Sequence, residues 1–288
     1  MSEQKFNPDG LGQWTEPSRF EVTRERLAAY AAATNDPTPA AVAGDLGNPI
    51  FAIVPVFESL MEPALEVVPL TLMGKILHGE QDFRFHRAIR PGDVLLSRST
   101  MTGWASAPNG TAACVYIECT DEATGELVNE QYVTFFVRGF DNGDTVGTLS
   151  PTHKLDPAVL DTDAAAEIKQ HVDDDQTYRY GPAAGDPMPI HLDDEFAKEM
   201  GLPGIIAHGL CTQAFTAWGA VQELAGGDIA RLRRHAVRFA KPVLPGQDII
   251  TAFHRTGSAD GITRYAFRTT ADGDVVVTDG LIEILEED

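Results

Sequence analysis

The stretch of sequence that decides the fold reads Tyr180-Gly-Pro-Ala-Ala-Gly-Asp-Pro-Met-Pro-Ile-His191, and it is followed by Gly201-Leu-Pro-Gly-Ile-Ile-Ala-His-Gly-Leu-Cys211. Pro187 and Pro189 lack a main-chain N–H and push the residues before them out of helical geometry. We therefore expect Asp186 and His191 to lie on a turn rather than on one face of a helix. A turn can aim both side chains at one point.

A helix is predicted directly after this stretch, over Gly209–Ala225. Its apolar residues recur at helical spacing, and no charged residue precedes Glu223. These apolar residues are Leu210, Ala214, Trp218, Val221 and Ala225. The pattern indicates a helix that is covered by protein, with its first free N–H at Gly209.

Composition and charge limit the classes of function. The 288 residues, 43% of them hydrophobic, can form a substantial core in one large or two ordinary domains. A formal net charge of -21 would repel nucleic acid and anionic membrane surfaces, so we expect neither as a partner. We attribute the acidity to solubility in a salty or crowded cytoplasm.

Targeting and cysteine patterns agree with that expectation. The amino terminus lacks a basic region followed by an apolar core, and no window approaches about 18 uninterrupted apolar residues, which predicts a cytoplasmic protein. Cys114, Cys119 and Cys211 are odd in number and lack the spacing of a disulfide framework or a zinc site. We expect them to be small core residues.

The chain contains an internal repeat. Tyr30 stands six residues before Asp36, as Tyr180 stands six before Asp186, and a later Pro-Gly turn also recurs in both halves. Three matches in the same order predict a duplication. The expected fold class is α+β, with two copies of an antiparallel sheet wrapped around a central helix. His191 has no counterpart in the first copy, where Ala41 takes its place.

The repeat sets the predicted domains. We expect a first, non-catalytic copy over residues 1–145, a linker over 146–175 that is polar and contains proline, and a second, catalytic copy over 176–288. In the first copy, a short strand-like stretch over residues 20–23 should lead into a helix from Arg24 that is capped by Thr23. Its predicted strands are Val94–Met101, Ala112–Cys119 and Asn129–Val137.

An Asp and a His on one turn beside a helix N-terminus have a clear chemical use. A carboxylate and a neutral imidazole can share and activate a water, while the Gly209 N–H approaches a carbonyl oxygen that gains negative charge. The alternative is structural: Asp186 would cap a short helix over residues 193–200, and His191 would fill a polar gap.

The second half resembles the MaoC-like (R)-specific enoyl-CoA hydratases, or hydratase 2 family, in their double hotdog form. The resemblance is carried by Tyr180, Gly185-Asp186, Pro189-Ile190-His191, Ala197, His208-Gly209-Leu210-Cys211 and the run from Arg238 to Gly246. It covers residues 175–286 strongly and the first half weakly. It implies that Asp186 and His191 activate a water that adds to C3 of a trans-2-enoyl-CoA. C2 is then protonated while the Gly209 N–H holds the thioester oxygen, with no cofactor and no metal.

Two positions depart from the family pattern. Met188 stands where the pattern has Asn, and Ala184 stands where Ser or Thr commonly precedes the Gly. These departures favour, as one alternative, a catalytically silent acyl-CoA-binding subunit. A second alternative is a hotdog thioesterase, in which water would attack the carbonyl carbon and release free CoA.

We assign substrate binding to residues around this motif and to a basic region. The assigned residues are His208, Arg234, Arg238, Lys241, Met188 and Phe57. The segment from Asp228 to Arg268 contains eight basic and only three acidic residues, which predicts a patch that binds the CoA phosphates. The alternative is that several of these cations pair with acidic residues elsewhere. A homodimer is the expected assembly.

The first copy should lack a long central helix. Pro55 can begin a helix, but Pro63 and Pro69 would each cost about 3 kcal/mol in a helix interior. The resulting space is expected to receive a medium, long or bulky acyl tail, unless side chains fill it. The expected lining is Phe51, Ile53, Val56, Phe57, Leu60 and Met61.

Overall fold

The computed structural model describes residues 5–287, without the side chain of residue 58. The chain forms two compact units that we call the first and second unit. The first comprises Met1–Phe20, Pro55–Arg84 and Val94–Thr152, and the second comprises Glu21–Val54, Phe85–Asp93 and His153–Asp288. The predicted boundaries at residues 145 and 175 stay a prediction.

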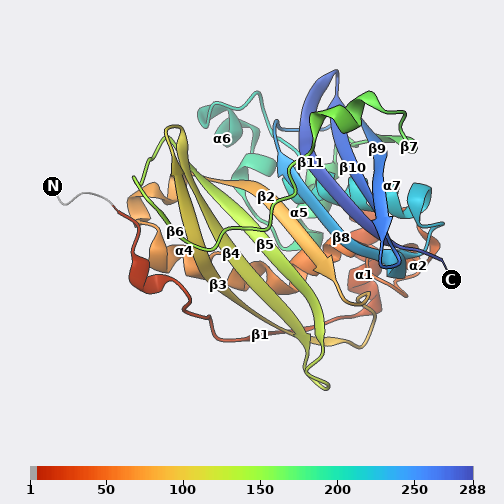
Figure 1. The fold of residues 1–288 in the computed structure, drawn as a ribbon, viewed down its shortest axis with the longest axis horizontal. Coiled ribbons are helices and arrows are strands. Elements are labelled where there is room, and N and C mark those ends of the chain that lie inside the picture. The colour runs from red at the N-terminus through yellow and green to blue at the C-terminus, as the bar shows by residue number, and fades with distance from the viewer. Residues whose placement is uncertain (1–4, 288) are drawn as a thin grey trace. The chain divides into compact units, whose positions relative to one another are not determined.

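The first unit is built on one antiparallel sheet with the order β1-β3-β4-β5-β2, and β6 pairs with β3 (Figure 1). Its strands are β1 (Ser18–Glu21), β2 (Ile76–Phe85), β3 (Val94–Ala107), β4 (Gly110–Asp121), β5 (Leu127–Arg138) and β6 (Thr145–Gly147). The three strands predicted from sequence correspond to β3, β4 and β5. Strand β3 begins at its predicted start and continues past Met101 to Ala107, and β4 and β5 extend beyond both of their predicted ends.

The central segment of the first copy is broken, as the prolines predict. It runs through η2 (Pro49–Val56), α3 (Phe57–Leu60), α4 (Glu62–Val67) and η3 (Leu70–Lys75), and η1 (Pro8–Gly10) precedes it. Pro63 has no N–H to offer the carbonyl of Ser59, four residues earlier. The hydroxyl of Ser99 on β3 donates to that carbonyl instead, with an O···O distance of 2.6 Å.

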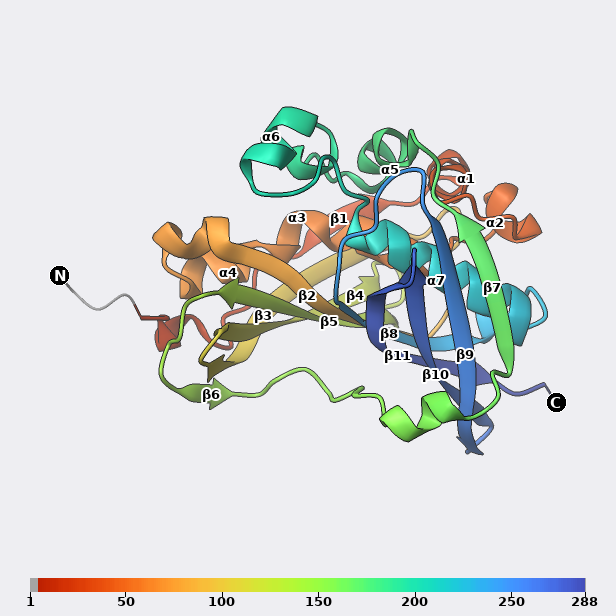
Figure 2. The same ribbon diagram turned by 90° about the horizontal axis from the view of Figure 1, so that it is seen from above.

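The second unit is a sheet packed against one long helix. Its strands follow the order β8-β11-β10-β9-β7. They are β7 (Ala166–His171), β8 (Leu232–Phe239), β9 (Asp248–Ala259), β10 (Ile262–Ala271) and β11 (Asp274–Leu285), with η4 (Pro157–Asp161) and η6 (Ile229–Arg231) outside the sheet. Helix α7 (Gly209–Leu224) runs along this sheet and is buried from Leu210 to Val221, which confirms the predicted helix (Figure 2). The predicted linker contains β7.

Polar side chains tie α7 to the sheet. The Gln170 side chain on β7 donates to the carbonyl of Phe215, with an N···O distance of 2.6 Å. Gln213 and Thr216 contact the two ring nitrogens of His235 on β8, each at 3.1 Å. His235 is fully buried, and this burial lowers its pKa to about 3.

The two tyrosines of the repeat meet in the second unit. Helix α1 (Arg24–Ala33), followed by α2 (Pro39–Val42), packs against α5 (Gln176–Ala184), and Thr23 caps α1 as predicted. The hydroxyls of Tyr30 and Tyr180 lie 3.2 Å apart, and both side chains are buried. Arg179 of α5 also donates to the carbonyl of Ala32. Matching residues of the two copies therefore hold the two helices together.

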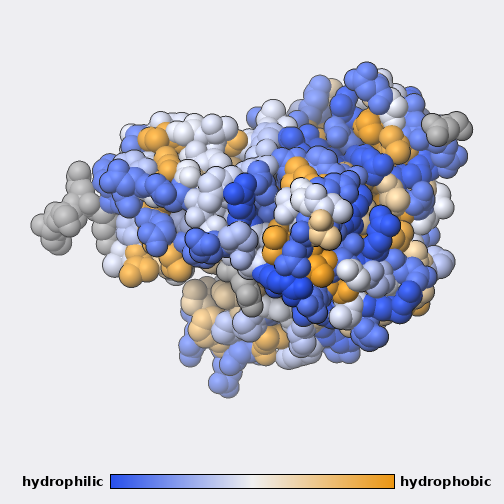
Figure 3. Space-filling view, turned by 90° about the horizontal axis from the view of Figure 1, so that it is seen from below, coloured by the Kyte–Doolittle hydropathy of each residue, from blue (hydrophilic) through white to orange (hydrophobic). Residues whose placement is uncertain are grey.

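The surface is dominated by polar and charged residues on the face shown in Figure 3. Within residues 5–287 no helix has the length and apolar character needed to cross a bilayer. The three cysteines are buried, and none of them forms a disulfide within residues 5–287, as predicted.

The broken segment gives a prediction about stability. Ser99→Ala should lower the free energy of unfolding by about 1–3 kcal/mol, because the buried Ser59 carbonyl loses its donor. Urea unfolding measures this change. In a Pro63→Ala background residue 63 regains an N–H, so the same substitution should cost measurably less. Equal costs in both backgrounds would show that Ser99 does not replace the missing donor.

Candidate active site

Asp186 lies at the end of α5, on the turn that the prolines predict. Gly185 ends the helix in the left-handed conformation, at φ 76°, which glycine adopts without strain. The N–H groups of Gly185 and Asp186 both donate to the carbonyl of Gly181. The Asp186 carboxylate then accepts the N–H of Met188 at 3.1 Å. The main chain therefore fixes the carboxylate.

His191 ends η5 (Pro189–His191), a single turn of 3-10 helix. Its main-chain N–H donates to the carbonyl of Met188, and its ring Nδ1 lies 2.8 Å from the carbonyl of Ile206. A carbonyl can only accept, so we assign the ring proton to Nδ1. The lone pair of the neutral ring is then on Nε2, available to accept a proton.

The N-terminus of α7 lies beside this turn. No side chain caps the helix, and its first residue, Gly209, is partly exposed. A Cβ at Gly209 would approach the ring of Phe239 to within 3.2–3.3 Å, so this position favours glycine. Two residues before the helix, the N–H of Ala207 donates to the carbonyl of Val243 at 2.8 Å. The helix thus presents free N–H groups and the positive end of its dipole.

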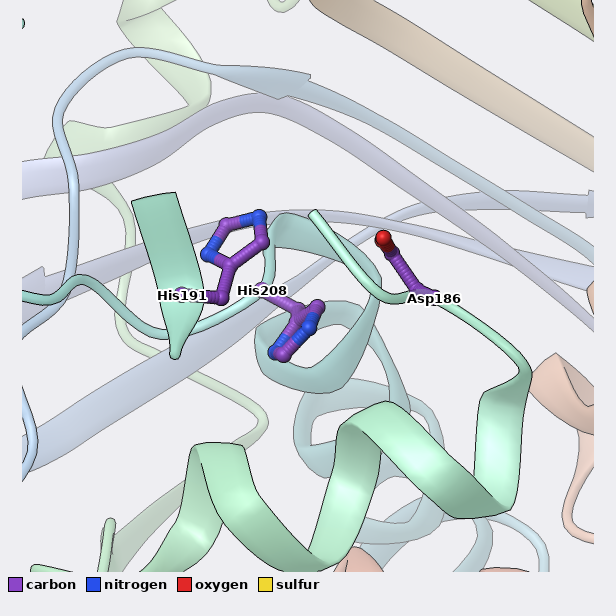
Figure 4. A group of neighbouring side chains, drawn as sticks. All are labelled: Asp186, His191 and His208. Atoms are coloured by element: carbon purple, nitrogen blue, oxygen red, sulfur yellow. The ribbon is translucent and has the colours of Figure 1, made fainter. Parts of the chain in front are cut away.

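His208, the residue before α7, completes the group (Figure 4). Its ring stacks on His191 with centroids 3.8 Å apart, and Tyr180 packs on it with centroids 4.9 Å apart. The side chain is 1% exposed, and neither ring nitrogen makes a hydrogen bond to another described residue. One ligand atom each from Asp186, His191 and His208 lies within 4.8 Å of the others.

The comparisons with known proteins identify the family. A MaoC-like domain matches residues 157–276, and a FAS1-like dehydratase domain region matches residues 10–131. The chain is 30% identical over 294 residues to 3-hydroxyacyl-thioester dehydratase Y of Mycobacterium tuberculosis, covering 96% of this chain and 98% of that protein. The chain belongs to the MaoC-like hydratase 2 family.

A further relative and two solved structures are also similar to the chain. A probable enoyl-CoA hydratase 2 of Dictyostelium discoideum is 29% identical over 210 residues, covering 72% of this chain and 69% of that protein. The structure of a MaoC-like dehydratase from Phytophthora capsici superposes with a TM-score of 0.83 at 21% identity, covering 98% and 100% of the two chains. A conserved hypothetical protein of Mycobacterium tuberculosis with a double hotdog fold gives 0.62 at 15% identity, covering 96% of each chain. The predicted double hotdog fold is confirmed.

Burial shifts the pKa values of Asp186 and His191 in opposite directions. Desolvation raises the pKa of Asp186, opposed by the Met188 N–H and by His191. Desolvation lowers the pKa of His191, opposed by the Ile206 carbonyl and by the Asp186 charge. Burial, with a smaller contribution from His191, lowers the pKa of His208 to about 3, although the main chain of Asp186 opposes the shift. Both imidazoles are therefore neutral at pH 7.

The structural alternative for Asp186 is wrong. Asp193, not Asp186, caps the short helix α6 (Asp194–Glu199) by accepting the N–H of Phe196 at 3.0 Å. In the first copy, Asp36 occupies the position equivalent to Asp186. Its two carboxylate oxygens accept from the Thr38 N–H and the Asn48 side chain, and it is buried. Its role is to hold its own turn.

The predicted substrate-binding residues lie in different places. Met188 is half exposed on the turn that carries Asp186 and His191, whereas Phe57 belongs to α3 of the first unit. Arg234 and Arg238 are on β8, and Arg238 lies 4.0 Å from Asp279. Lys241 pairs with Asp274 at 2.6 Å. Ion pairs of Arg231 and Arg264 with Glu287 and Glu283 further support the alternative that this basic region is partly neutralised.

The Nδ1–H tautomer and low pKa of His191 can be checked by NMR. In ¹⁵N-histidine-labelled protein, the resonances that vanish in His191→Ala should titrate below the ordinary value of 6.5 and show a protonated Nδ1. Asp186→Asn removes a charge that favours the imidazolium, so it should lower the His191 pKa further. A pKa above 6.5, or an upward shift in that variant, would contradict the geometry.

Proposed function

We propose that Asp186, His191 and the Gly209 N–H hydrate trans-2-enoyl-CoA to the (R)-3-hydroxyacyl-CoA, or catalyse the reverse dehydration. Membership of the hydratase 2 family makes the chain a hydratase or dehydratase of the lyase class. The observation that carries the residue roles is local. An aspartate and a neutral histidine are fixed by main-chain bonds on one turn, beside an uncapped helix N-terminus.

The proposed reaction uses each group once. A water donates one hydrogen bond to the Asp186 carboxylate and one to Nε2 of His191, and its oxygen attacks C3. The π electrons move toward C2 and the thioester oxygen, which the Gly209 N–H and the helix dipole stabilise. The pair takes one proton from the water and returns one to C2, so the net change is the addition of H₂O.

The two departures from the family pattern are compatible with activity. The Met188 main-chain N–H, rather than a side-chain amide, holds the Asp186 carboxylate. Ala184 is buried at the end of α5, and the turn closes through Gly185 and Gly181. Neither position therefore has to provide a polar side chain for the turn to form. This argues against the catalytically silent alternative.

Substitutions on the two turns test the residue roles. Asp186→Asn and His191→Ala should each lower kcat for hydration by about 100-fold or more, because the water loses its base. Asp36→Asn is the matched control, since the same change on the first-copy turn should alter the rate little. The assay follows loss of the enoyl-thioester absorbance and analyses the product on a chiral column. A comparable loss from Asp36→Asn, an (S) product or release of free CoA would each count against the proposal.

We also propose that the substrate carries a medium, long or bulky acyl chain, and that the first copy accommodates it. The supporting observation is the broken central segment, which replaces one continuous helix with α3, α4 and two 3-10 turns. Phe51, Ile53, Val56 and Leu60 are buried apolar residues of this region. The alternative remains that these side chains fill the space themselves.

A series of enoyl-CoA substrates tests the chain-length proposal. Each methylene that becomes buried contributes about 0.8 kcal/mol, so kcat/KM should rise tenfold or more from four to ten carbons if that binding is realised in the transition state. The wild-type enzyme is assayed under one set of conditions. A flat or falling series would contradict the proposal while leaving the hydratase activity in place. Homodimer formation and a cytoplasmic location stay predictions.

A further inference from the structure

His208 is a buried polar side chain without a visible partner. It is 1% exposed, and neither ring nitrogen meets hydrogen-bond geometry with another described residue. The main chain of Asp186 lies near enough only to oppose the lowering of the His208 pKa. A buried polar group left unpaired costs about 1–3 kcal/mol. Such a group needs either a structural reason or a partner that arrives with the ligand. Stacking against His191 and Tyr180 requires only a flat ring and gives no reason for nitrogen atoms.

The spacing of the three side chains fits a water molecule. Their ligand atoms lie at most 4.8 Å apart. Three partners of a tetrahedral water, each at about 2.8 Å, are separated by about 4.6 Å.

The arrangement of hydrogen-bond donors and acceptors around the water indicates the role of His208. The Asp186 carboxylate and Nε2 of His191 are both acceptors, so they take the two protons of the water. A third partner must then donate to one of the two oxygen lone pairs. A neutral imidazole has one N–H to donate, and the low pKa of His208 keeps it neutral. The fourth direction, the remaining lone pair, is left free to attack.

We propose that His208 donates an N–H to the nucleophilic water and thereby aims its free lone pair at C3. This inference rests on the proposed hydration reaction and adds a third partner to the Asp186–His191 pair. The family pattern has Asn at position 188, and the Met188 of this chain has no side-chain N–H to donate. His208 would supply the donor that Met188 lacks.

Two substitutions at one position separate this role from ring stacking. His208→Phe keeps a flat ring between His191 and Tyr180 but removes the N–H, whereas His208→Gln loses the ring and keeps an N–H donor. We expect His208→Phe to lower kcat for hydration about tenfold to hundredfold with little change in KM, and His208→Gln to retain more activity than His208→Phe. Stacking alone predicts the opposite order.

Further controls distinguish a failure of the proposed hydratase function from a failure of the proposed role of His208. Asp186→Asn is assayed in parallel, so a wild-type protein without hydratase activity would overturn the proposed function itself. Wild-type activity with His208→Phe equal to or above His208→Gln would overturn only the role of His208. Thermal unfolding confirms that each variant is folded. If His208→Phe does not fold, His208→Leu takes its place as the variant without an N–H donor, and its kcat is compared with that of His208→Gln. Loss of wild-type activity on dialysis against EDTA, restored by Zn²⁺, would show that the three groups hold a metal and would also overturn the role.

Discussion

The hydrogen bonds of the main chain around Gly185 are the constraint on which the candidate active site depends. Gly185 ends α5 in a conformation that other residues adopt only with strain, and the two N–H groups that follow the helix converge on the Gly181 carbonyl. From there the peptide of Met188 contacts both catalytic candidates, since its N–H holds the Asp186 carboxylate and its carbonyl accepts from His191. The geometry of the pair is therefore set by the main chain, and side chains at intervening positions can vary.

The same turn is anchored to a pair of helices that the duplication places together. Tyr180 contacts Tyr30 of α1 through its hydroxyl and His208 through its ring. Four rings therefore contact one another in succession, in the order Tyr30, Tyr180, His208 and His191. Through these contacts, a tyrosine of the first copy supports the histidines of the second copy. All four residues belong to the second unit. Residues 21–54, which belong to the first copy by sequence, therefore serve the second copy structurally.

The sequence was most informative where local chemistry decides the structure. Prolines at 187 and 189 predicted the turn, the uncharged run after Gly209 predicted α7, and Pro63 predicted the break in the first copy. Contacts between distant residues could not be predicted in this way. The Ile206 carbonyl that sets the tautomer of His191 is a main-chain group with no signature in the sequence. The carboxylates that pair with the basic residues of the second unit lie on neighbouring strands and turns, so counting local charge overstated the basic patch.

The two copies differ more clearly in how many of their polar groups have hydrogen-bond partners than in which residues they contain. Both turns place an aspartate six residues after a tyrosine, and both carboxylates accept the N–H two residues further along. In the first copy the second oxygen of Asp36 is occupied by Asn48, and Ala41 offers nothing to share. In the second copy the second oxygen of Asp186 and both nitrogens of His208 have no partner among the described residues, and the tautomer of His191 leaves Nε2 free. Several neighbouring polar groups without hydrogen-bond partners lower the stability of a folded protein, because each has lost its hydrogen bonds to water. The cost is confined to one point beside a helix N-terminus, which is where a polar substrate would remove it.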